Sequence, residues 1–122
     1  MTDIDDLLKL DATSQAQLVR DGQIRPLELV DAAIGQIERL NPELNAVITP
    51  MYDQAREAAV GDIPDGPFAG VPFLLKDLLA YWKGVRHTSG CAALKDFVPD
   101  HDSELVVRYR QSGLIVVGRT NT

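Results

Sequence analysis

The sequence predicts an α/β fold in which helices pack on a parallel or mixed β-sheet. Apolar residues recur at the spacing of one helix face, at Leu27, Val30, Ile34, Ile37 and Leu40. Residues 113–118 form a β-branched apolar run between two glycines, which suits a strand buried on both faces of a sheet. Helical patterns thus come first in the chain, and patterns of both strands and helices follow.

The first part of the chain carries clear helix boundaries. Asp11 can cap a helix that runs toward Asp21, where Gly22 is well placed to end it. Pro26 suits the first position of the next helix because its missing N–H is not needed there. We expect Asn41-Pro42 to close that helix, since proline cannot continue it.

The second part alternates between strands, helices and turns. We expect a strand over 46–49, a helix from about 54 to 60, and a turn-rich loop over 61–67. A capped helix is expected from about Asp102 to Gln111. Its inward face is expected to carry Leu105, Val106 and Tyr109. Residues 1–122 contain no linker or repeat, so we expect no internal domain boundary.

The apolar run near the C-terminus leads to an expectation about completeness. A domain rarely ends on a buried strand with nothing after it to pair its edge, because open edges invite association. If 114–117 is an interior strand, we expect an unpaired edge, an exposed apolar face and self-association. The chain is therefore expected to be the N-terminal fragment of a single larger domain. Association of several copies into a homo-oligomer is an open alternative.

Composition excludes several classes of function. The chain has 122 residues, 45% of them hydrophobic and 25% charged, which lies in the globular range. Its formal net charge of −6 argues against a nucleic-acid or anionic-membrane partner. Cys91 is the only cysteine, which fits a reducing compartment. The N-terminus is acidic and has no signal-peptide core, and no apolar run is long enough to span a membrane. We expect a cytoplasmic protein without a cofactor.

Lys76 is the most informative side chain. Residues 71–76 alternate as in a short strand, with one face carrying Val71, Phe73 and Leu75 and the other Leu74 and Lys76. Desolvation disfavours the charged ammonium, so a lysine in this apolar run could lose its proton near neutral pH and serve as a base. The alternative is a strand-end lysine whose stem covers apolar surface while its head stays in water.

Four segments in matching order and spacing resemble the amidase signature family. Residues 70–77 (GVPFLLKD) resemble its lysine motif, and residues 40–46 resemble its early helix-to-strand junction. Residues 88–91 resemble its Thr-x-Gly-Ser element, and residues 102–121 resemble the segment that precedes its catalytic serines. The resemblance covers nearly the whole chain from about Asp11 onward. It implies the N-terminal portion of the amidase signature fold, incomplete, with helices on a mixed sheet.

The resemblance implies an amide-bond hydrolase with a Ser–cis-Ser–Lys triad. Lys76 would be its catalytic lysine, which takes a proton from the cis-serine. The family's Gly-Gly-Ser-Ser-Gly-Gly run and its nucleophilic serine would follow Thr122, so we expect this chain to be inactive alone. Two departures are Cys91, where serine is more usual, and Arg119, where lysine is more usual. Arg119 is expected to be tolerated because the charge is retained.

The resemblance also suggests a substrate, a small-molecule amide. Residues 11–13, 41–48 and 66–72 look closest to family members that hydrolyse the cyclic dimer of 6-aminohexanoate. One alternative is the A subunit of the glutamyl-tRNA amidotransferase, which would require further protein partners. Another is a non-catalytic fragment with a role in association.

Other polar residues follow Lys76 in the sequence. Ser89 resembles part of a family loop near the active site, so it is a candidate for substrate binding. Asp77 is expected to be a cap or turn residue. His87 and His101 are not at metal-ligand spacing, and no metal is expected. Cys91 has no nearby base to activate it as a nucleophile.

Overall fold

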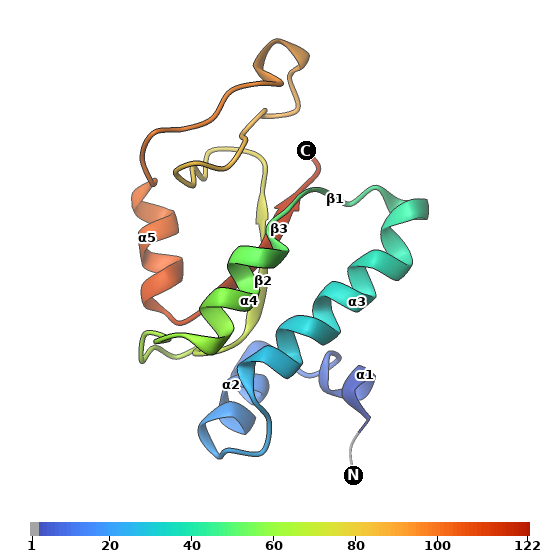
Figure 1. Cartoon of the computed structure of the whole chain (residues 1–122), viewed down its shortest axis with the longest axis vertical. Coiled ribbons are helices and arrows are strands. Elements are labelled where there is room, and N and C mark those ends of the chain that lie inside the picture. The colour runs from blue at the N-terminus through green and yellow to red at the C-terminus, as the bar shows by residue number, and fades with distance from the viewer. Residues whose placement is uncertain (1–2) are drawn as a thin grey trace.

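A computed structural model describes residues 3–122 and confirms the α/β class (Figure 1). No helix in this described part is long and apolar enough to cross a membrane. In chain order the elements are α1 (Ile4–Leu7), α2 (Ala12–Arg20), α3 (Pro26–Leu44), β1 (Val47–Pro50), α4 (Tyr52–Val60), β2 (Pro72–Lys76), the 3₁₀ turn η1 (Ala92–Leu94), α5 (Glu104–Gln111) and β3 (Ile115–Thr120).

The three strands form a mixed sheet in the order β1-β3-β2. β3 pairs antiparallel with β1 and parallel with β2, so it has a neighbour on both sides. The expectation that strand 114–117 leaves its own edge unpaired is therefore wrong, because two strands from earlier in the chain cover both of its edges. The open edges of this sheet belong to β1 and β2, two short strands that each contain a proline.

Helices cover both faces of the sheet (Figure 1). On one face, α3 and α4 pack on β3 through Val30, Ile34, Ala55, Ala59, Ile115 and Val117. On the other face, α5 and the loop after β2 pack on the sheet through Met51, Leu75, Ala80, Val85, Val106 and Val116. Neighbouring residues of β3 thus enter opposite layers, which explains why the whole run is apolar.

α3 begins at Pro26 as predicted but continues past Pro42 to Leu44, so the expected end at Asn41-Pro42 is wrong. The helix recovers after the proline because the Asn45 N–H donates to the Asn41 carbonyl at 2.8 Å. Asn45 then ends the helix in a left-handed conformation with φ 47°. The Asn41 side chain bonds both the N–H and the carbonyl of Val47, at 2.8 Å each, and joins α3 to β1.

The other helix boundaries fall close to the predictions. Asp11 caps α2 by accepting from the Ser14 N–H at 2.8 Å, and Gly22 follows the helix with φ 72°. α4 begins about two residues earlier than expected. In α5, Val106 is fully buried, but Leu105 is 47% exposed, so its predicted inward position is wrong. The adjacent position on a helix points about 100° away from the buried face.

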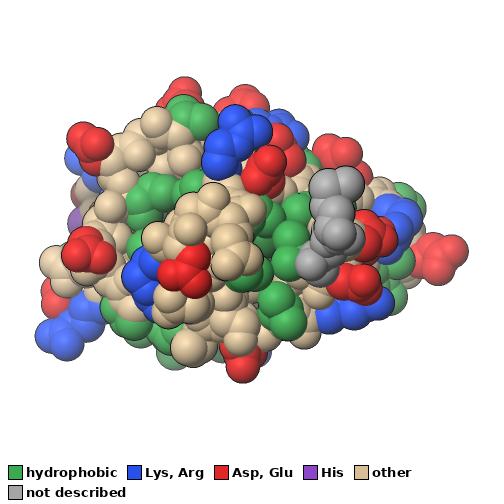
Figure 2. Space-filling view, turned by 90° about the horizontal axis from the view of Figure 1, so that it is seen from below, with side chains coloured by type: hydrophobic (Ala, Val, Ile, Leu, Met, Phe, Trp, Pro, Cys, Tyr) green, Lys and Arg blue, Asp and Glu red, His purple; other side chains and the backbone are tan. Residues whose placement is uncertain are grey.

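Apolar side chains also reach the surface. Figure 2 shows them between acidic and basic side chains on the end of the molecule that contains α1 and α2. Leu40 and Leu44 near the end of α3 are 42% and 64% exposed. The apolar stripe predicted for α3 is therefore buried at Val30 and Ile34 and uncovered toward the C-terminal end of the helix.

Gly113, between α5 and β3, should tolerate no side chain. Its φ is +92°, and an added Cβ would lie 2.4 Å from the Ala69 Cα and 2.7 Å from the Ala69 nitrogen. We expect Gly113→Ala to lower the free energy of unfolding by about 2–4 kcal/mol, measured by urea denaturation. Gly35→Ala in α3 is the control, since its added Cβ meets nothing within 4 Å. This change should raise stability by about 0.5–1 kcal/mol, and equal midpoints for the two variants would contradict the assignment.

Candidate active site

The candidate site lies where the parallel strands β2 and β3 end, at Lys76 and Thr120. Ligands of open α/β sheets commonly bind at this carboxyl edge. The loop 77–103 and the C-terminus of the chain lie at the same end of the sheet (Figure 1). Residues far apart in sequence therefore meet here.

Lys76 is the last residue of β2, and its side chain is exposed. The predicted alternation is confirmed, since Leu75 is buried while Leu74 and Lys76 share the more exposed face. The apolar neighbours expected to desolvate the lysine do not enclose it, because Leu78 is 37% exposed and Leu79 79% exposed. Within residues 3–122 the Lys76 side chain is thus exposed to solvent.

Asp77 is fully buried and is not the simple turn residue that was expected. Its carboxylate accepts from the Thr88 N–H at 3.0 and 3.2 Å and from the Thr88 hydroxyl. Its backbone N–H donates to the Thr120 carbonyl at 3.0 Å, and its carbonyl accepts from the Thr122 hydroxyl at 3.1 Å. The residue directly after Lys76 therefore ties the ends of both strands to the loop.

Arg119 is fully buried opposite Leu75 in the sheet. Its Nε donates to Asp77 Oδ1 at 3.4 Å, and its Nη2 donates to the Lys76 carbonyl at 2.9 Å. Nη2 also lies 2.5 Å from His87 Nδ1. A guanidinium fork can reach several groups at once, which a lysine ammonium at the end of a flexible stem does less well. Arg119 therefore retains the positive charge and also joins Asp77, His87 and the Lys76 carbonyl through its hydrogen bonds.

His87 is buried between Arg119 and the loop, with 1% of its surface exposed. Its Nδ1 faces Arg119 and lies 3.7 Å from Asp77 Oδ1, while its Nε2 lies 3.1 Å from Ser89 Oγ. The ring meets Tyr81 edge to face with the centroids 4.6 Å apart. His101 instead lies on the surface beside Asp100. Within residues 3–122 no three side chains are grouped to hold a metal ion.

Burial and charge set the protonation of this cluster. Burial lowers the pKa of His87, and the Arg119 charge lowers it further, while Asp77 opposes both. Burial alone would raise the pKa of Asp77, but the Thr88 hydrogen bonds and the charges of Arg119 and His87 outweigh it. The pKa of Asp77 therefore lies below its ordinary value. At neutral pH the arrangement is a carboxylate, a guanidinium and an imidazole that resists protonation.

Ser89 lies at a bend of the loop 77–103, directly after Thr88, which is hydrogen-bonded to Asp77. Its φ of 53° and the 67° of Gly90 are left-handed, and a non-glycine residue in that region stores about 1–3 kcal/mol of strain. Its side chain is half-buried. Cys91 is exposed with a free thiol, and its N–H donates to the Thr88 carbonyl at 2.9 Å. The candidate Ser89 thus lies beside the fixed cluster, and Cys91 lies at its solvent side.

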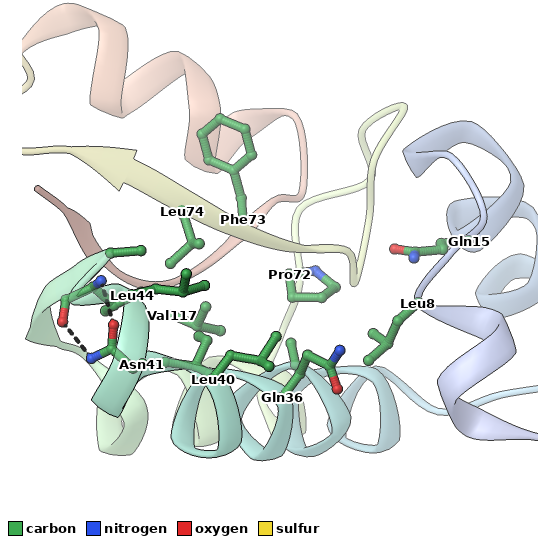
Figure 3. A pocket seen from close by; sticks show the side chains of 14 residues that line it. Leu8, Gln15, Gln36, Leu40, Asn41, Leu44, Pro72, Phe73, Leu74 and Val117 are labelled. Atoms are coloured by element: carbon green, nitrogen blue, oxygen red, sulfur yellow. Dashed lines mark hydrogen bonds between the residues drawn. The ribbon is translucent and has the colours of Figure 1, made fainter.

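An apolar groove runs between α3 and the sheet, on the face that carries Leu74 and Lys76 (Figure 3). Leu74 and Val117 point into it, whereas Phe73 points to the other face (Figure 3). The groove has a volume of about 400 Å³, and α3 contributes Leu40 and Leu44. Apolar concavities of this kind usually mark a binding surface.

Comparison with known proteins decides the family. A sequence model of the family named Amidase matches residues 28–122. The chain belongs to the amidase family. Among solved structures, this amidase chain superposes on 6-aminohexanoate cyclic dimer hydrolase complexed with substrate, with a TM-score of 0.86 and 44% identity over 93% of the chain. It also superposes on a bacterial aryl acylamidase of the amidase signature family, with a TM-score of 0.83 and 36% identity over 93% of the chain. The predicted amidase signature fold is confirmed.

Curated relatives of this amidase chain fall into more than one group. It is 45% identical over 114 residues to the 6-aminohexanoate-cyclic-dimer hydrolase of Paenarthrobacter ureafaciens, covering 92% of the chain and 23% of that protein. It is 35% identical over 122 residues to the A subunit of the glutamyl-tRNA(Gln) amidotransferase of Dehalococcoides mccartyi (strain CBDB1), covering 95% of the chain and 25% of that protein. The two solved structures are likewise covered over only 23% and 25% of their lengths. The amidase chain thus spans about a quarter of these relatives.

Proposed function

We propose that this chain is the N-terminal part of an amide-bond hydrolase of the Ser–cis-Ser–Lys type and supplies its lysine. The observation that carries the proposal is the position of Lys76 at the carboxyl end of β2. The buried pair of Asp77 and Arg119 fixes the backbone there, since Arg119 holds the Lys76 carbonyl. Membership of the amidase family, with Lys76 inside the segment that resembles the family's lysine motif, supports the same role.

The chemistry needs more than this chain contains. Amide hydrolysis requires a nucleophile, a base that takes its proton and donors that hold the oxyanion. A neutral Lys76 would take a proton from the cis-serine and return it to the departing amine. Both serines would come from chain beyond residue 122, so these residues alone would be inactive. The exposed apolar groove, which Leu74 lines on the same face of β2 as Lys76, supports the view that further chain packs against that face.

The substrate class that we propose is a cyclic amide such as the 6-aminohexanoate cyclic dimer. Identity of 45% to a hydrolase of that name supports it, against 35% to the amidotransferase, the second candidate. The third candidate function is a non-catalytic role in association. The partner would be a small-molecule amide rather than nucleic acid or a membrane, and association between copies of the chain is an additional proposal. We also propose a cytoplasmic location, because the presence of a single cysteine in residues 1–122 fits a reducing compartment.

Chimeras test this proposal. The chain would replace the matching segment of the Paenarthrobacter ureafaciens hydrolase, and in a second chimera the matching segment of the Dehalococcoides mccartyi amidotransferase. We expect the first chimera to release amine from the cyclic dimer and to keep a larger share of its host's activity than the second. The 122-residue chain alone should release none. A folded first chimera without activity would overturn the proposed function, and a better second chimera would favour the amidotransferase.

A further inference from the structure

The hydrogen bonds of His87 define where its proton lies. A guanidinium can only donate hydrogen bonds, so His87 Nδ1, at 2.5 Å from Arg119 Nη2, must accept. A proton on Nδ1 would point at the N–H of Arg119. The imidazole is therefore neutral with its hydrogen on Nε2. That hydrogen is donated to Ser89 Oγ, at 3.1 Å.

The charged and titratable groups around the ring favour this state. From β3, Arg119 faces Nδ1; Asp77, directly after β2, has its Oδ1 3.7 Å from Nδ1; and Tyr81 of the loop packs on the ring edge to face. Burial and Arg119 both lower the pKa of His87 and outweigh Asp77, which would raise it. The neutral form thus persists below the pH at which an ordinary histidine protonates.

The Ser89 hydroxyl is consequently used as an acceptor, and its own hydrogen is free. Among residues 3–122, no acceptor binds that hydrogen, since the bond to His87 is the only one that its Oγ makes. The side chain is half-buried at the bend with φ 53°. The adjacent Thr88 is held by Asp77, the residue after Lys76, so the position of the Ser89 donor is fixed relative to the end of β2.

We propose that His87 is a positioning residue that holds the Ser89 hydroxyl as an acceptor and thereby directs its hydrogen to the carbonyl oxygen of an amide substrate. Arg119 sets this direction by occupying the other nitrogen of the ring. Ser89 is then the residue that touches substrate, and His87 acts through it. The substrate half of this inference rests on the proposed function, whereas the state of the His87 ring does not.

The ring state can be measured on the 122-residue chain by nitrogen-15 NMR of its two histidines. The His101→Gln variant assigns the resonances. At pH 7 we expect His87 to show a protonated Nε2 and an unprotonated Nδ1, and to keep this pattern through about pH 6.5, the ordinary histidine pKa. An Nδ1–H tautomer or an imidazolium at pH 7 would overturn the proposal, whatever the activity of any chimera. If the chain gave no resolved spectrum, the same measurement on the first chimera, with its histidines assigned by variants, would decide.

Kinetics of the first chimera test the link to substrate. Ser89→Ala and His87→Leu should each reduce kcat/KM by about 2–10-fold, the effect of one neutral hydrogen bond. His87→Gln, whose amide N–H can replace Nε2–H, should retain most of it, as should the surface control His101→Leu. In a Ser89→Ala background, His87→Leu should cost no more. A further loss there would overturn the positioning role, and a normal kcat/KM for a folded Ser89→Ala would overturn the role of Ser89.

Discussion

Lys76→Arg in the first chimera is expected to reduce kcat by about 10²–10⁴-fold, as loss of a general base does. Arginine keeps the positive charge and much of the stem, but it cannot release its proton in a protein. Lys76→Ala should lose activity to a similar extent, because both changes would remove the proposed proton acceptor. The measurement is amine release from the cyclic dimer at saturating substrate, with circular dichroism to verify folding.

Lys83→Arg is the matched control, since Lys83 is an exposed lysine of the adjacent loop. It should leave kcat unchanged. A purely electrostatic role for Lys76 would survive the arginine substitution in good part. If Lys76→Arg retained most of the kcat of the parent chimera while Lys76→Ala lost it, the proton-relay assignment would have to be abandoned.

Arg119→Met should lower the free energy of unfolding of the 122-residue chain by about 3–5 kcal/mol, as expected when one partner of a buried ion pair is removed. The change leaves the fully buried Asp77 carboxylate without its cation and His87 Nδ1 without its donor. Urea denaturation at pH 7 measures the effect. Native chains normally have only about 5–15 kcal/mol of stability, so this loss would remove a large share of it.

Arg108→Met is the control for this variant. Arg108 pairs with Glu104 on α5 with both side chains 73% exposed, and such surface pairs contribute about 0–1 kcal/mol. The double variant Asp77→Leu with Arg119→Met removes both charges and should be less unstable than Arg119→Met alone. Equal stability of Arg119→Met and Arg108→Met would show that the buried pair does not hold the site together.

The buried pair also explains why part of the site escaped prediction. Asp77 follows Lys76 and was expected to be a cap or turn residue, because the alternation of a strand points neighbouring side chains to opposite faces. Its cation is Arg119, 42 residues away, and its loop partner is Thr88. The sequence contained only a weak signal for this pairing. Asp77 and Arg119 each follow an apolar run, and parallel pairing of those runs would bring the two residues to one edge of the sheet. His87 gave no signal beyond its unsuitable spacing for metal binding.

The sequence by itself determined the features that depend on local periodicity and on motifs. Alternation over 71–76 placed Leu74 and Lys76 on one face, helical spacing placed Val30 and Ile34 in the core, and the lysine motif indicated the amidase family. These follow from the roughly 2.0 and 3.6 residue periods of strands and helices, which are properties of neighbouring residues.

Only the tertiary structure decided which strand became central and which charges became buried. Two strands from earlier in the chain cover both edges of β3, so the strand expected to be open is paired on both sides. Burial of Asp77, His87 and Arg119 is favourable only because the three meet, and each comes from a different segment. Whether a charge can be buried depends on partners distant in sequence, and no local pattern contains that information.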